Sequence, residues 1–296
     1  MNITEEYKRI FKTFSFGVLN FFSNFINKYF IFPLIIFYWG NDLFNEWIVV
    51  TNIALQFSLF DFGTKIYLGN KLAKKNNKIE YYYKYVALIN LISIVCIALC
   101  LLSILTIFDF SQKIQTLSNI EFNLVIIFST LLIILNIIIG NLGEVTLRPI
   151  GLNYKYQKID FSFNLFISLI LVLSLILNAK IVIFTAINFI LVLSKFIYLK
   201  NYITKKNIII NDLVFNFNFF NLKKFKIIIF NSFFFYLSNL VNLIQTSTLI
   251  LVSSIGMGIS QIGTFVVHKT LSSISNQITN NLALAFTYEY TKSYLQ

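Results

Sequence analysis

Two lysines stand inside long apolar stretches, Lys28 in the first stretch and Lys269 in the last. A lysine at the centre of a bilayer costs at least about 2.5–3.5 kcal/mol, and such a residue usually faces a partner or a water-filled path. At about 1.5 Å of helix per residue, both lysines are predicted near the middle of the membrane or slightly outward of it. Asp61 and Glu144 are predicted near the cytoplasmic face, so neither acid lies at a comparable depth. Two unpaired cations in one cavity would suit an anionic ligand, whereas a buried ion pair is the alternative.

Polar side chains recur at helical spacing on the same stretches. In the first, Asn20, Asn24, Asn27 and Lys28 follow i, i+4, i+7, i+8 spacing and so share one helix face. The other stripes are Asn52 and Gln56 in the second stretch, Asn239, Asn242, Gln245 and Thr246 in the seventh, and Lys269, Ser272, Asn276 and Asn280 in the eighth. One such asparagine could simply join two helices, at about 0.6 kcal/mol per hydrogen bond. Four stripes together predict a hydrated cavity. The reason is that exposing these polar groups to lipid would cost more free energy than hydrogen bonds between helices contribute. The predicted substrate-binding residues are Lys28, Lys269, Asn24, Asn27, Asn242, Gln245 and Asn276.

Several other ionisable residues have both structural and functional interpretations. Asp61 could cap its helix or pair with Lys65, or it could couple transport to a second species. His268 is the only histidine, and it could respond to protons or form a hydrogen bond in a packed interface. A single histidine excludes a histidine metal cluster and a Ser–His–Asp constellation. Glu144 and Arg148, four residues apart, are expected to form a local pair on one helix. With no Walker-type phosphate loop either, we expect no enzyme, no metal site and no cofactor.

The composition defines the elements that must position these residues. The chain has 296 residues, 57% hydrophobic and 12% charged, with a mean hydropathy of +0.75. A soluble domain carries about 25% charged residues, so a water-soluble or disordered chain is excluded. Apolar runs without alternating polarity indicate helices rather than a β-barrel. Cys96 and Cys100 lie within one such run and are expected to pack. We predict an all-α polytopic transmembrane helix bundle of about eight spans: Phe14–Tyr38, Leu43–Ile66, Tyr85–Phe108, Phe122–Thr146, Phe161–Asn178, Ile181–Leu199, Ile227–Val252 and Ile262–Phe286.

The charge distribution predicts the orientation of these spans. The formal net charge is +12, from 24 lysines and arginines against 12 acidic residues. Nearly all of the basic residues, Lys195 among them, fall on one side of the eight-span topology, and only Lys113 and Lys180 fall on the other. The positive-inside rule then places the N-terminus and Gln296 in the cytoplasm, with the chain in the cell inner membrane. This asymmetry accounts for the charge without a nucleic-acid partner.

The first two spans resemble the last two. One constant displacement along the chain places Asn24 on Asn242, Gly40 on Gly258 and Phe44 on Ile262. Both pairs start on the cytoplasmic side, so the copies run parallel, as in transporters whose halves are related by an axis along the membrane normal. We predict a six-helix N-terminal lobe over residues 1–200, a cytoplasmic linker over 201–226, and the start of a second lobe over 227–296.

Short motifs in these spans resemble those of the bacterial polysaccharide-export flippases. The run Tyr38–Trp47 is similar to that family's W-G-x-x-x-[YF]-G-x-W, with Asn45 in place of the usual glycine. Leu59–Gly63 is similar to the [SL]-x-D-x-G that ends the second helix of the family, and Gly263–Leu271, continuing to Glu289, resembles its eighth helix. Arg148–Gly151 is a looser match to the basic turn after the fourth helix.

The resemblance implies the fold of the multidrug/oligosaccharidyl-lipid/polysaccharide exporters, in which two six-helix lobes face a central cavity. It implies a polyprenyl-pyrophosphate-linked oligosaccharide of O-antigen or capsule, flipped to the periplasmic leaflet by alternating access. Lys28 and Lys269 occupy helices that carry cavity-lining cations in relatives, whereas the second span has no central cation. Membrane lipids, a polysaccharide polymerase and glycosyltransferases are the implied partners.

Alternatives remain at this stage. A cation-coupled small-molecule or drug exporter of the same fold would also fit the topology. Because the family normally has twelve or more helices, the chain could also be a fragment, a truncated and inactive remnant, or a part completed by another chain.

Overall fold

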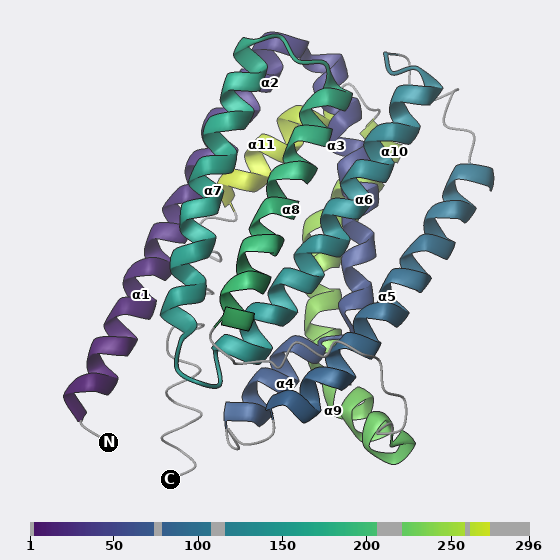
Figure 1. Ribbon diagram of the computed structural model, residues 1–296. Helices are drawn as coiled ribbons and strands as arrows, with labels where there is room; N and C mark the ends of the chain where they lie inside the picture. Colours follow the sequence, from purple (N-terminus) through teal and green to yellow (C-terminus); the bar gives the residue numbers. More distant parts are fainter. Residues whose placement is uncertain (1–2, 74–78, 108–115, 206–220, 258–260, 273–296) are drawn as a thin grey trace.

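Every regular element that the structure describes is helical. The structure is a computed structural model, and it describes residues 3–73, 79–107, 116–205, 221–257 and 261–272. Figure 1 shows long helices packed side by side in a bundle. Within the described residues, 7 helices are long and apolar enough to cross a membrane: Phe11–Trp39, Asn41–Leu72, Lys84–Thr106, Asn119–Leu147, Asn153–Ile176, Ile181–Lys205 and Leu222–Ser254. The predicted all-α class is confirmed, and the chain is a multi-pass membrane protein.

Three of these spans are single α-helices, and the other four include short segments of a different helical geometry. π-Helical segments occupy Asn27–Ile31, Gly143–Leu147 and Ile244–Thr248, and a 3₁₀ turn occupies Phe57–Asp61. The α-helices are α1 (Ile3–Ile26), α2 (Phe32–Trp39), α3 (Asn41–Gln56), α4 (Thr64–Ala73), α5 (Ile79–Ile107), α6 (Asn119–Leu142), α7 (Asn153–Ile176), α8 (Ile181–Lys205), α9 (Leu222–Leu243), α10 (Leu249–Met257) and α11 (Ile262–Ser272).

Consecutive spans cross the bundle in alternating directions (Figure 1). The junction of α2 with α3 lies at the upper end of the view, and α4 lies at the lower end with the start of α9. Gly40 separates α2 from α3 at a φ of +82°, a backbone conformation that glycine adopts without steric cost. Ser118 begins α6 with a capping box, in which its hydroxyl accepts from the Glu121 amide.

The outer surface of the bundle is as apolar as its interior. Phe37 and Leu177 are each 79% exposed and Phe230 is 73% exposed, while Phe44 and Leu175 are fully buried in the main core. Large exposed apolar side chains over every span are expected where the surrounding solvent is hydrocarbon. Cys96 and Cys100 are free and half-buried, and Cys100 packs against a small apolar core, as predicted.

The predicted spans match the observed helices apart from their ends. The first helix begins at Ile3 rather than Phe14, and α7 begins at Asn153 rather than Phe161. The predicted linker 201–226 is helical at both borders, because α8 continues to Lys205 and α9 begins at Leu222. Of the predicted eighth span, only α11 (Ile262–Ser272) lies within the described residues.

Candidate functional site

Lys269 lies on α11, opposite the π-helical segment that divides the preceding span. The side chain is half-buried, and its ammonium group donates to the main-chain carbonyl of Thr246. The same ammonium lies 5.9 Å from the centre of the Phe265 ring. A carbonyl dipole and an aromatic face both attract a cation. The carbonyl contact joins α11 to the span that contains α9 and α10, whereas Phe265 lies one turn earlier on α11 itself.

The predicted polar face of the seventh span lies beside this lysine. Asn242, Gln245 and Thr246 are all exposed on the surface of the described bundle. Thr246 donates its hydroxyl proton to the Asn242 carbonyl, so the hydroxyl oxygen keeps free lone pairs. A π-helical segment, a feature often found at functional sites, runs through this stretch. The carbonyl that Lys269 binds belongs to the residue next to Gln245 and lies one helical turn from Asn242. The role of these three residues in binding stays a prediction.

The polar residues predicted on the first span differ in where the structure places them. Asn24 is exposed, as a cavity-lining residue would be, whereas Asn20 is 5% exposed and donates to the Gln157 side chain at 2.7 Å. Asn20 therefore joins α1 to α7, and its placement in the polar lining was wrong. Asn27 and Lys28 belong to the π-helical segment after α1, but their side chains lie outside the described part, as does all of Asn276.

The predicted repeat has a structural counterpart. The π-helical segments Asn27–Ile31 and Ile244–Thr248 fall within one residue of equivalent positions under the predicted alignment. The same alignment places Asn45 on Gly263, and these two residues touch: the Gly263 amide donates to the Asn45 side-chain carbonyl at 2.8 Å. A residue meets its own counterpart only close to a two-fold axis. A two-fold relation between the first two spans and the last two would produce this contact between Asn45 and Gly263. Gly258, the predicted partner of Gly40, lies outside the described residues.

The two candidate coupling residues differ in their surroundings. Asp61 is 4% exposed and forms an ion pair with Lys65 at 3.0 Å, which is the structural pairing considered from the sequence. His268 is exposed on α11 next to Lys269. The expected Glu144–Arg148 pair is present at 3.6 Å. Among the described residues, no three histidine, cysteine or acidic side chains are grouped closely enough to hold a metal ion.

Sequence reasoning missed a buried charged pair between α7 and α8. Lys195 is 6% exposed and binds Asp160, with Asn164 at 3.4 Å. Counting Lys195 with the basic loops was wrong, because it lies ten residues inside the end of α8, at Lys205. Asp160 lies seven residues after the start of α7, at Asn153. The available signal was the i, i+4 spacing of Asp160 and Asn164 opposite a lone lysine in an apolar run.

Glu46, on α3 near the α2–α3 junction, is buried for a different reason. The Glu46 carboxylate accepts from the main-chain amides of Thr116 and Leu117, each at 2.9 Å. A buried carboxylate bonded to two amides anchors the chain before α6. Glu46 therefore has a structural role there.

Comparison with known proteins finds no matching family model, no matching curated protein and no matching solved structure.

Proposed function

We propose that this chain is a transporter that moves a polyprenyl-pyrophosphate-linked oligosaccharide, an O-antigen or capsule repeat unit, from the cytoplasmic to the periplasmic leaflet by alternating access. In this proposal it lies in the cell inner membrane with both ends in the cytoplasm. Its partners are membrane lipids, a polysaccharide polymerase and glycosyltransferases. The motifs of Tyr38–Trp47, Leu59–Gly63 and Gly263–Leu271 suggest this substrate class.

The observation that carries the proposal is the position of the Lys269 ammonium group. It is held by a carbonyl and an aromatic ring beside an exposed polar face, so its charge can act on a ligand that reaches Asn242 and Gln245. A lysine binds phosphate as a compact point charge, and amide side chains can hydrogen-bond sugar hydroxyls. Lys28 would supply the second cation from the equivalent π-helical segment of the first helix pair.

Export of surface polysaccharide by a strain that lacks its own flippase would test this role. Lys269→Met keeps the length of the side chain and removes its charge, and we expect it to reduce export at least tenfold. Lys269→Arg should retain most of the export, and Lys28→Met should resemble Lys269→Met. Lys180→Met, at the opposite end of the bundle from α4, is the matched control. Normal export by both Lys28→Met and Lys269→Met at normal membrane abundance would contradict the proposal.

Asp160 favours a second candidate function, a cation-coupled small-molecule exporter. An intramembrane carboxylate next to a lysine is an arrangement that proton- and cation-driven transporters can use, and Asp160 contacts Lys195 inside the bundle. A pump-deficient strain would separate the two functions by its drug resistance. Resistance that requires Asp160 and tolerates Lys269→Met would support the exporter and oppose the flippase.

A further inference from the structure

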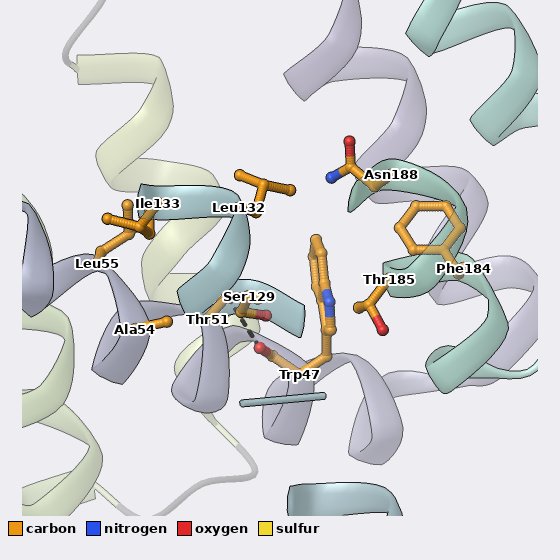
Figure 2. Close-up of a pocket in the computed structure, with 10 residues that line it drawn as sticks. All are labelled: Trp47, Thr51, Ala54, Leu55, Ser129, Leu132, Ile133, Phe184, Thr185 and Asn188. Atoms are coloured by element: carbon orange, nitrogen blue, oxygen red, sulfur yellow. Dashed lines mark hydrogen bonds between the residues drawn. The ribbon is translucent and has the colours of Figure 1, made fainter. Parts of the chain in front are cut away.

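A pocket of about 150 Å³ lies among the first six spans, between α3, α6 and α8. Figure 2 shows the Trp47 indole standing among the side chains that surround this space. None of the lining residues carries a charge, and most of the lining is carbon. The pocket is lined by Trp47, Thr51, Ala54, Leu55, Ser129, Leu132, Ile133, Phe184, Thr185 and Asn188.

The indole of Trp47, which lines this pocket, carries a buried hydrogen-bond donor. Its Nε1 is buried and has no hydrogen-bond partner among the described residues. The ring is fixed by edge-to-face contacts with Trp39, whose ring centre is 6.2 Å away, and with Phe184, at 6.1 Å. By contrast, Trp39 Nε1 donates to the Ala179 carbonyl at 3.0 Å. An unmet buried donor costs about 1–3 kcal/mol, so a ligand that accepts from Trp47 recovers this cost.

Two threonines supply acceptors. Thr51 donates its hydroxyl proton to carbonyls of its own helix, those of Trp47 and Ile48. Thr185 does the same to the carbonyls of Ile181 and Val182. Each hydroxyl proton is therefore used by the backbone, and the oxygen lone pairs remain for a donor in the pocket.

We propose that this pocket binds a neutral molecule of about one aromatic ring that accepts a hydrogen bond from Trp47. A cavity of similar volume lined by apolar side chains holds benzene, so the volume suits a ring. The absence of charge on every lining residue excludes an ionic ligand, because a buried ion without a partner is strongly unfavourable. A phenol-like hydroxyl has both functions, since its oxygen accepts a hydrogen bond of the kind that Trp47 offers and its proton can be donated to a threonine oxygen.

This proposal is independent of the transport role. The pocket shares no residue with Lys269 and the polar face of α9, and the failure of either proposal leaves the other standing.

The test uses the purified full chain titrated with phenol, benzene or benzylammonium. Because the chain has only two tryptophans, Trp39→Phe leaves Trp47 as the single indole fluorophore. Phenol should give a saturable shift of the emission to longer wavelength as the indole N–H gains a partner. Benzene should bind more weakly and without this shift, and benzylammonium should not bind. A response to phenol that does not saturate, or an equal response to benzylammonium, would overturn the proposal.

Substitutions in the pocket test whether phenol binds there. Ser129→Leu fills the pocket and should abolish phenol binding, whereas Thr185→Val removes one hydroxyl and should weaken it about three- to tenfold. Thr106→Val is the matched control, because Thr106 donates to its own helix in the same way but is exposed on α5. Undiminished binding by Ser129→Leu would disprove the site. If that variant does not fold, equal affinities of Thr185→Val and Thr106→Val would disprove it instead.

Discussion

The two helix pairs of the predicted repeat share a local geometry but differ in what surrounds them. Each pair has a five-residue π-helical segment in its first span, at Asn27–Ile31 and at Ile244–Thr248. In the first pair, α1 packs along α7 and α3 packs along α6. The second pair contacts mainly α3 and α4, and much of α9 is exposed.

The same polar pattern therefore has different uses in the two pairs. Asn20 is buried against α7, while Ser238, which aligns with it, is exposed. Asn24 and its counterpart Asn242 are exposed in both copies. A helical stripe determines which residues share a face, and the neighbouring helices determine whether that face binds another helix or stays open.

The largest effect is expected where α9 meets the turn after α3. Gly63 has a φ of +65°, and a Cβ there would lie 2.5 Å from the Tyr236 main-chain nitrogen. Gly63→Val should destabilise the protein by about 3 kcal/mol or more, through backbone strain and a clash with a main chain that cannot move aside. Thermal unfolding of the purified protein measures this loss. Gly40→Ala is the control, because Gly40 also has a positive φ but has no atom within 4 Å of its Cβ position; equal losses would mean that the contact with α9 contributes nothing.

A smaller effect is expected at the contact between counterparts. Asn45→Ala leaves the Gly263 amide without its acceptor in a buried site, which should cost about 1–3 kcal/mol. Asn52→Ala is the comparison, because the amide of Asn52 donates only to the Ile48 carbonyl of its own helix. Chemical crosslinking between cysteines on α3 and α11 would show whether the helices also separate more often. A loss at Asn45 no larger than that at Asn52 would contradict a contact that joins the pairs.

The smallest effect should separate two asparagines on α1. Asn20→Ala removes the bonds to Gln157 and should cost about 1 kcal/mol. Asn24→Ala should change the stability by less than about 0.5 kcal/mol, because the side chain is exposed. The unfolding temperatures of the two variants, measured under the same conditions, test this difference. A loss at Asn24 as large as that at Asn20 would place Asn24 in packing rather than on an open face.

The spans were predictable because length and apolarity are local properties of the sequence. The start of α7 was not, because the polar segment Asn153–Asp160 is helical only through burial against α1 and α8, with Asp160 bound to Lys195. The polar stripes of the seventh and eighth spans followed from helical spacing alone, and their role in binding stays a prediction. The Asn45–Gly263 contact joins residues far apart in the chain, and the π-helical segments have no compositional signature.

Each π-helical segment contains one residue more than an α-helix of the same length would need. Because the wider turn takes up that residue, the helix before the segment and the helix after it keep nearly the orientation of one continuous α-helix. Deletion of a single codon from Ile244–Thr248 would therefore keep every span and leave Asn242 on nearly the same side of the helix, while it would remove the local widening at the Thr246 carbonyl that Lys269 binds. A change invisible to any topology prediction would thus act on the lysine contact and leave the polar face in place.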